Sequence, residues 1–217
     1  MKRVDFKSSD LILLSIFFIF SGIGAAQGIQ LSSQEISWIG EKVFENECAS
    51  KDECLVEWNE SEDFLSVGIA HFIWYPKACA GPFEESFVKF LNYAKASGKK
   101  IPCWLNAKPF SACPWNSREE FLSDQKKPKL QELRGFLKAT KSQQAEFIVE
   151  RLKDALPVML EKAPKKDRQK ISRQFNRLAS ISAGVYALVD YLNFKGLGIF
   201  DSERYKGKRC FDGSLRS

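Results

Sequence analysis

A short stretch of alternating side-chain size constrains the fold of this chain more than any other feature. Residues 64–75 read Phe-Leu-Ser-Val-Gly-Ile-Ala-His-Phe-Ile-Trp-Tyr, and the large side chains of Leu65, Val67 and Ile69 alternate with small ones. A period of two predicts a strand with one face on the core and one face that something approaches closely. Because helical periodicity governs the rest of the chain, the sequence predicts a mainly α fold of the α+β type, with one short β-hairpin segment.

Helical patterns occupy the sequence on both sides of this segment. Ser32 and Glu35 have the spacing of a capping box, which predicts the start of the first helix. Thr140 and Gln143 are expected to cap the start of a later helix. We expect Pro157 to bend or end that helix. Residues 181–194 are apolar on most sides, so we expect a buried central helix there. The first helix is expected at 32–47. Others are expected at 82–96, 117–124 and 128–139, and 164–173 is expected to be an exposed helix start.

The N-terminus has the pattern of a segment for export. Three basic residues, Lys2, Arg3 and Lys7, precede an apolar run over 11–26 that closes on small residues, as in a cleaved secretory signal peptide. The run is shorter than the roughly 20 residues of a bilayer span. A retained membrane anchor is the alternative interpretation. We therefore expect residues 1–26 to be a signal peptide of an exported bacterial protein, secreted or periplasmic, with no stable membrane span after cleavage.

The composition is that of an ordinary globular domain. Hydrophobic residues make up 44% and charged residues 28% of the chain, which excludes disorder and a multi-span membrane protein. The 33 basic and 27 acidic side chains give a net charge of +6, which suits a polyanionic or carboxylate-bearing partner and identifies none; we expect no nucleic acid as a partner. Since the sequence has no repeat and no linker, we expect a single domain over 27–217 that acts as a monomer.

All six cysteines lie after the predicted signal, where an oxidising compartment favours disulfides. Cys48–Cys54 and Cys103–Cys113 are the pairs closest in sequence and the first candidates, although six cysteines allow many other pairings. The chain has no Cys-x-x-Cys motif and a single histidine. Zinc ribbons, thioredoxin-like centres and sites with several imidazoles therefore lack their residues. We expect no metal and no cofactor.

The last turn of the first predicted helix carries a candidate catalytic acid. Ile36, Gly40 and Val43 form the inward stripe of this helix, and Glu47 continues it. The helix C-terminus disfavours a negative charge by roughly 0.3–1 kcal/mol, which shifts a pKa by less than about one unit. Burial must therefore supply most of any increase in the pKa of this carboxyl. A glutamate that only ends a helix and bonds to the next loop is the simpler interpretation.

The residues that follow Glu47 resemble the active-site region of phage-type lysozymes. In that family a catalytic glutamate closes the first long helix, a β-hairpin follows, and a Thr-Ile-Gly-Ile-Gly-His sequence ends it. Here Ser66 matches the threonine, Gly68 the first glycine and His71 the histidine. Ala70 replaces the second glycine, which removes some backbone freedom.

The resemblance extends to a second acidic position. The phage pattern has an acidic residue six positions before the threonine, and Glu60 has that offset from Ser66. The interval between the glutamate and the histidine is longer here than in phage lysozymes, which leaves Glu62 and Asp63 as alternatives for this position.

Two longer strings, 58–76 and 190–205, also resemble a group of uncharacterised exported bacterial proteins with a lysozyme-like fold. The chain departs from that group at 208–217, which stand in place of a Gly-Trp-Gly-Leu-Leu-Gln-like stretch. The resemblance implies a lysozyme-like helical domain of the phage-lysozyme or lytic-transglycosylase kind, with peptidoglycan or a related polysaccharide as partner.

The activity implied by this resemblance is cleavage of the β-1,4 bond between the amino sugars of peptidoglycan. Glu47 would protonate the leaving oxygen. Glu60 or Asp63 would position a water molecule or stabilise the cation, and Ser66 would orient the water or a sugar substituent. The small Gly68 would leave room for the glycan. Without a second carboxylate, a hydroxyl of the sugar itself would attack, as in lytic transglycosylases.

Aromatic residues near the β segment are candidates for stacking on sugar rings. Trp58 and Tyr75 flank the predicted hairpin, and Tyr191 lies in the last predicted helix. Core packing is the simpler role for such residues. His71 is interpreted as a structural residue at a strand end, partnered by a carboxylate on a neighbouring helix.

Two other functions remain open from the sequence. One is a Cys–His hydrolase that cuts peptide crosslinks, with Cys48, Cys54 or Cys79 as nucleophile and His71 as base. The other is a non-catalytic, secreted module that binds cell-wall glycan or a protein partner. Digestion of purified peptidoglycan distinguishes this binding module from an enzyme.

Overall fold

The computed structural model describes residues 29–77, 79, 81, 83–106, 110 and 112–195, and the backbone of 204–205 and 208–209. The predicted signal peptide, Cys210 and most of the tail lie outside the described residues. The described part is mainly helical with a small antiparallel sheet, which confirms the predicted fold class. Among these residues, no helix is both long enough and apolar enough to cross a membrane.

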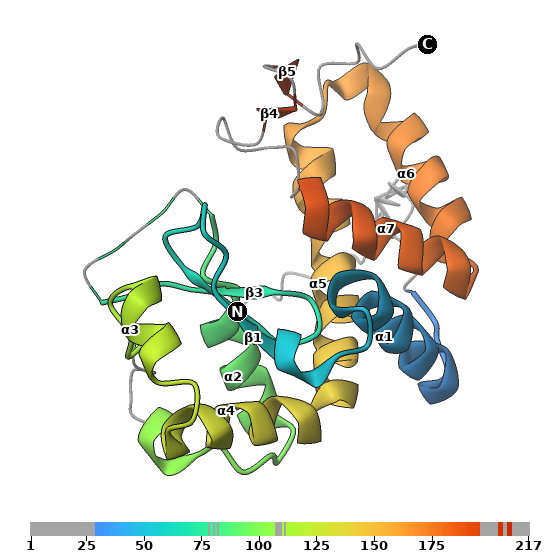
Figure 1. The fold of residues 1–217 in the computed structure, drawn as a ribbon. Coiled ribbons are helices and arrows are strands. Elements are labelled where there is room, and N and C mark those ends of the chain that lie inside the picture. The colour runs from blue at the N-terminus through green and yellow to red at the C-terminus, as the bar shows by residue number, and fades with distance from the viewer. Residues whose placement is uncertain are drawn as a thin grey trace, which may run out of the picture.

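Seven α-helices form the described structure, and the first four overlap the ranges expected at 32–47, 82–96, 117–124 and 128–139. They are α1 (Ser33–Cys48), α2 (Ser86–Ala96), α3 (Arg118–Ser123), α4 (Pro128–Ala139), α5 (Lys141–Lys162), α6 (Lys165–Ala179) and α7 (Ser182–Lys195). Short 3₁₀ helices span Asp52–Leu55 and Cys103–Leu105. Figure 1 shows α1, α5, α6 and α7 together on one side of the molecule, with α2, α3 and α4 beside the small sheet.

The capping box predicted for the first helix is present. Ser32 Oγ accepts a hydrogen bond from the backbone N–H of Glu35, and the Glu35 carboxylate accepts one from the backbone N–H of Ser32. The two bonds satisfy backbone donors that a helix start otherwise leaves unpaired.

The sheet contains three antiparallel strands in the order β1 (Val56–Glu57), β2 (Leu65–Val67) and β3 (Phe72–Trp74). A separate pair, β4 (Arg204–Tyr205) and β5 (Lys208–Arg209), lies near the C-terminus. The prediction of one strand that continues through Ile69 was wrong, because a turn over 68–71 separates β2 from β3. Ile69 is only 1% exposed, so a buried turn residue extended the apolar alternation beyond the end of the strand.

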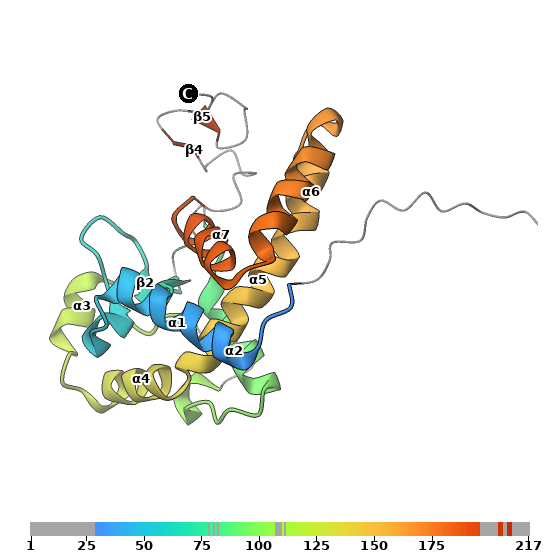
Figure 2. The same cartoon turned by 90° about the vertical axis from the view of Figure 1, so that its right-hand side faces the viewer.

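The central helix of the fold is α5, which packs against α1, α2, α6 and α7 (Figure 2). Its Ala145 lies so close to α1 that a Cβ added to Gly40 would come within 2.6 Å of the Ala145 Cβ. The prediction that 181–194 is a buried central helix was wrong. In α7, Val185 is fully buried, whereas Tyr191 is 40% exposed, so the helix buries one side only.

Two expectations about α5 need correction. Of the two effects predicted for Pro157, a bend or an end of the helix, the second is wrong, because the helix continues through the proline to Lys162. Thr140 makes no side-chain cap bond at the start of α5, because its buried hydroxyl donates to the carbonyl of Phe136 in α4 instead. Thr140 is the one residue between α4 and α5, and its hydroxyl bonds to the last turn of α4 rather than to the first turn of α5.

One of the two candidate disulfides is present. Cys48 at the end of α1 is bonded to Cys54 in the first 3₁₀ helix. The other candidate pair, Cys103 and Cys113, is not bonded, because both residues are free thiols. The backbone N–H of Cys113 donates to the carbonyl of Tyr75, which holds this buried cysteine next to the end of β3. Burial raises the pKa of the Cys113 thiol to about 12.

Candidate functional site

Glu47 lies in the last turn of α1, immediately before the disulfide-bonded Cys48. Its side chain is 26% exposed, so the carboxyl is partly dehydrated and still reaches solvent. Burial raises the pKa of Glu47; the nearby His71 opposes this shift, and the negative charge of Asp190 adds to it. The net result is a carboxyl that keeps its proton to higher pH than an ordinary glutamate does.

The structure places His71 next to this carboxyl. The His71 Nδ1 is 3.6 Å from the Glu47 Oε2, and the imidazole is 22% exposed. The backbone of His71 has a φ of 48°, in the left-handed region that is unfavourable for a residue with a side chain. Such a conformation persists only where the surrounding structure imposes it.

A buried glutamine holds the turn that carries His71. Gln144 of α5 is fully buried, and its Oε1 accepts a hydrogen bond of 2.8 Å from the backbone N–H of Ile69. Its Nε2 donates to the carbonyl of Leu137 at the end of α4. At Gly68 (φ of 81°) an added Cβ would lie 2.5 Å from the Gln144 Oε1. The sequence analysis expected Gly68 to leave room for a glycan. Gln144 fills that space instead, so the missing side chain of Gly68 allows the glutamine to pack against the turn.

The other side of the His71 ring faces the disulfide. The His71 Nε2 is 3.1 Å from the Cys54 Sγ and 3.7 Å from the Cys48 Sγ. These three residues have the side-chain types of a metal site and of a Cys–His hydrolase. In the disulfide neither sulfur is a thiolate, which is the form of cysteine that binds metals and attacks carbonyls. In this state the cluster therefore lacks the ligands and the nucleophile for both.

A residue of α7 completes the surroundings of Glu47. Asp190 Oδ1 accepts a hydrogen bond of 2.8 Å from Asn46 Nδ2, which links α7 to the end of α1. The sequence analysis gave Asp190 no role of its own, because no local pattern indicates that it returns to a helix 144 positions earlier in the chain. Tyr191 follows Asp190 and is 40% exposed on the same helix.

The three candidates for the second acidic residue have different surroundings. Glu60 is 84% exposed and pairs with Arg118 at 3.4 Å. Glu62 Oε2 accepts a hydrogen bond of 3.3 Å from the hydroxyl of Ser66, which is itself only 2% exposed. Asp63 is exposed. The hydroxyl that was expected to orient water is therefore bonded to Glu62 rather than to Glu60 or Asp63.

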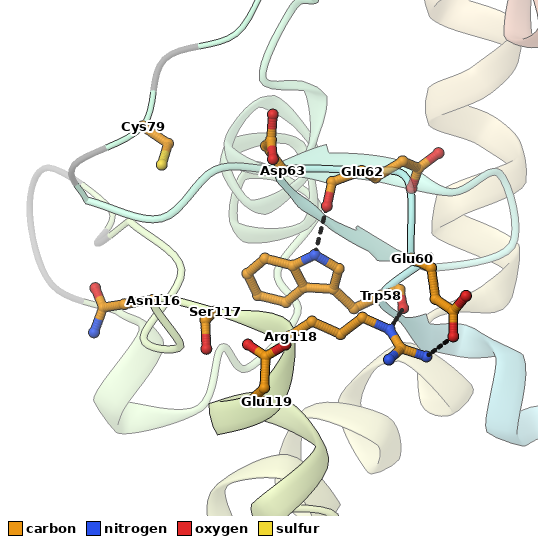
Figure 3. A pocket seen from close by; sticks show the side chains of 9 residues that line it. All are labelled: Trp58, Glu60, Glu62, Asp63, Cys79, Asn116, Ser117, Arg118 and Glu119. Carbon is orange, nitrogen blue, oxygen red and sulfur yellow. Dashed lines mark hydrogen bonds and ion pairs between the residues drawn. The ribbon is translucent and has the colours of Figure 1, made fainter.

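A pocket of about 370 Å³ lies beside these acidic residues (Figure 3). Its lining comprises Trp58, Glu60, Glu62, Asp63, Cys79 and residues 116–119. Trp58 is 5% exposed; its Nε1 donates to the carbonyl of Glu62, and its own carbonyl accepts from Arg118 Nε. Neither Glu47 nor His71 lines this pocket. Glu47 at the end of α1 thus lies apart from the other acidic candidates, Glu60, Glu62 and Asp63, which line the pocket around Trp58.

A second pocket, of about 330 Å³, contains the remaining aromatic candidate. Tyr75 lines it together with Phe83, Glu85 and Cys79. The Tyr75 side chain is largely buried, and its hydroxyl accepts a hydrogen bond of 3.4 Å from the backbone N–H of Phe83. Burial raises the pKa of Tyr75, so the phenol stays protonated.

The comparisons with known proteins assign no family to this arrangement. No protein-family model, no curated protein and no solved structure matches the chain. The lysozyme-like resemblance therefore rests on the motif residues themselves and stays a prediction.

Proposed function

We propose that the protein cleaves glycan strands of peptidoglycan, with Glu47 as the general acid. The observation that carries this proposal is the partly buried carboxyl at the end of α1, whose pKa burial raises. A general acid must hold a proton near the pH at which it works and release it to the substrate. Glu47 combines a raised pKa with access to solvent, which suits that role.

In the proposed reaction Glu47 donates its proton to the glycosidic oxygen as the bond from that oxygen to the anomeric carbon breaks. The electron pair of the bond stays with the leaving oxygen, and an oxocarbenium-like centre develops. Either a water molecule or a hydroxyl of the sugar then attacks this centre. The first outcome is that of a muramidase, and the second gives the anhydro sugar of a lytic transglycosylase.

Digestion of purified peptidoglycan tests this proposal. Mass spectrometry of the soluble fragments detects one added water for each hydrolysed bond and none for each transglycosylation. Glu47→Gln should lower the rate about 100-fold or more, as expected for loss of a general acid. Glu45→Gln is the matched control, because Glu45 lies on the same helix, is 60% exposed and pairs with Lys42. Equal rates for wild type and Glu47→Gln would remove Glu47 from the mechanism.

A non-catalytic glycan-binding module is the second candidate, because the larger pocket does not include Glu47. Carboxylates, an amide and a hydroxyl line this pocket (Asp63, Asn116 and Ser117 among them), and such groups can bind sugar hydroxyls. Under this alternative the protein pellets with insoluble peptidoglycan without releasing fragments. Asp63→Ala and Asn116→Ala would weaken pelleting, whereas Glu47→Gln would not.

A further inference from the structure

The single histidine of the chain lies between a disulfide and the proposed catalytic acid. We propose that the Cys48–Cys54 disulfide is a redox-exchange site for a dithiol reductant, and that His71 transmits its redox state to Glu47. The second half of this proposal rests on the proposed function of Glu47, whereas the first half does not.

The two cysteines of the disulfide differ in their exposure. Cys54 is partly exposed, whereas Cys48 is 4% exposed and packs in the core. The loop between them contains Ala49 and Ser50, whose φ values of 47° and 59° are left-handed. Non-glycine residues adopt this conformation only where the surrounding structure imposes it. Ala49 is the C-cap of α1, and the backbone N–H groups of Ala49 and Ser50 donate to the carbonyl of Phe44, so backbone hydrogen bonds as well as the crosslink hold this loop.

The exchange reaction balances with a dithiol as the reductant. A thiolate of the dithiol attacks the Cys54 Sγ, the Cys48–Cys54 bond breaks, and its electron pair passes to the Cys48 Sγ, which takes up a proton. The second thiolate of the reductant then attacks the mixed disulfide and releases Cys54. The protein gains two electrons and two protons, and the reductant leaves as a disulfide. His71 Nε2 lies near both sulfurs and can stabilise each departing thiolate.

Reduction would change the charge next to Glu47. The sulfurs of the disulfide carry no proton, whereas reduced Cys54 offers a thiol next to the His71 Nε2. Transfer of that proton from sulfur to nitrogen gives a thiolate–imidazolium pair. The imidazolium then lies beside the Glu47 carboxyl and favours its ionised form. An ionised Glu47 has no proton to donate, so the reduced protein should cleave glycan more slowly.

Charged groups on other elements also act on Glu47. Asp190 and Tyr186 of α7 have electrostatic interactions with this carboxyl, and His71 reaches it from the turn after β2. Asp190 favours the protonated form and opposes the effect of reduction. The exchange reaction forms and breaks no bond to Asp190 or Tyr186, so we attribute the difference between the two redox states to His71.

Proton NMR tests the proposal directly, because one histidine gives one set of ring signals. The ring is titrated in the disulfide form and after reduction by excess dithiol. The midpoint should move to higher pH by about one unit or more on reduction, as expected for an opposite charge nearby. Cys48→Ser keeps the Cys54 thiol and should behave like the reduced protein. Cys54→Ser should not behave like the reduced protein. Cys103→Ser, which changes an exposed free thiol, is the control.

The exchange half has its own measurement. His71→Ala and His71→Gln should slow reduction by excess dithiol, because a leaving thiolate that is less stabilised departs more slowly. Thermal unfolding checks that both variants are folded. Reduction at the wild-type rate in both variants would overturn the role of His71. An unchanged midpoint in reduced wild type would overturn the thiolate–imidazolium pair.

The coupling to Glu47 is measured without any glycan. Because coupling is reciprocal, Glu47→Gln in the reduced protein should lower the histidine midpoint. If it does and wild type releases no fragments in either redox state, the proposed function fails and the coupling stands. If fragments are released equally fast in both states, the transmission to Glu47 is overturned and the proposed function stands.

Discussion

The end of α1 and the Trp58 pocket both contain predicted site residues, but the fold supports them in different ways. Around Glu47 and His71, a fully buried glutamine, a disulfide and left-handed backbone fix the side chains. Around Trp58, the acidic residue Glu60 is 84% exposed and is held by one ion pair. A carboxyl that must keep its proton needs a fixed, partly dry environment, whereas surface groups that contact a sugar do not. This contrast favours the end of α1 as the place for acid chemistry.

The largest expected effect comes from the glutamine behind His71. Gln144→Leu leaves the N–H of Ile69 and the carbonyl of Leu137 without their buried partner, so the free energy of unfolding should fall by about 3 kcal/mol. Chemical denaturation measures this change. Gln143→Leu is the control, because the buried Oε1 of Gln143 has no hydrogen-bond partner. A loss of similar size in both variants would show that Gln144 does not hold the turn specifically.

Two glycines with similar backbone give the next prediction. Gly68 (φ of 81°) and Gly98 (φ of 74°) are both left-handed, but a Cβ at Gly98 meets nothing within 4 Å, whereas one at Gly68 meets Gln144. Both alanine variants lose about 1–2 kcal/mol from the backbone conformation. Gly68→Ala should lose about 1–2 kcal/mol more, because the tightly packed turn has to shift. Equal losses in denaturation experiments would contradict this close packing.

The pH dependence of stability isolates the carboxyl of Glu47. Because its pKa is raised in the folded state, the folded protein binds more protons than the unfolded one above the ordinary value of 4.5. The free energy of unfolding of wild type should therefore fall, relative to Glu47→Gln, as pH rises from about 4.5 through the raised pKa. Denaturation of both proteins over this range is the measurement. A difference that is independent of pH would contradict the dehydrated environment.

The smallest effect is expected in the exposed pair of the Trp58 pocket. Glu60→Gln removes an ion pair with Arg118 in which the carboxylate is largely in solvent. Exposed pairs contribute roughly 0–1 kcal/mol, so the free energy of unfolding should change by less than about 1 kcal/mol. A loss as large as that of Gln144→Leu would show that this region is as firmly held as the end of α1.

The sequence predicted the features that depend on nearby residues. These features are the capping box of Ser32 and Glu35, the first four helices and the Cys48–Cys54 bond. Each depends on residues that are close together in the sequence. The apolar stripe of α1 also indicated that Glu47 is partly buried, since a helix face that meets the core includes its last turn.

The features that the sequence did not predict depend on residues brought together from distant parts of the chain. Gln144 and Asp190 reach the site from α5 and α7, and neither has a local pattern that distinguishes it from an ordinary polar residue. Cys113 is close to Cys103 in sequence, but its pairing with the end of β3 determines its position. The helix through Pro157 likewise reflects tertiary packing, which overrides a local preference.

The contact of α1 with α5 at Gly40 and Ala145 has a mechanical consequence. Gly40 has no side chain and Ala145 has only a methyl group, so the two backbones approach closely there, and a sliding movement of α5 would displace α1 with it. Glu47 lies seven residues further along α1, about 10 Å from the point of contact. Small substitutions on the far side of α5 should therefore shift the Glu47 carboxyl without contacting it.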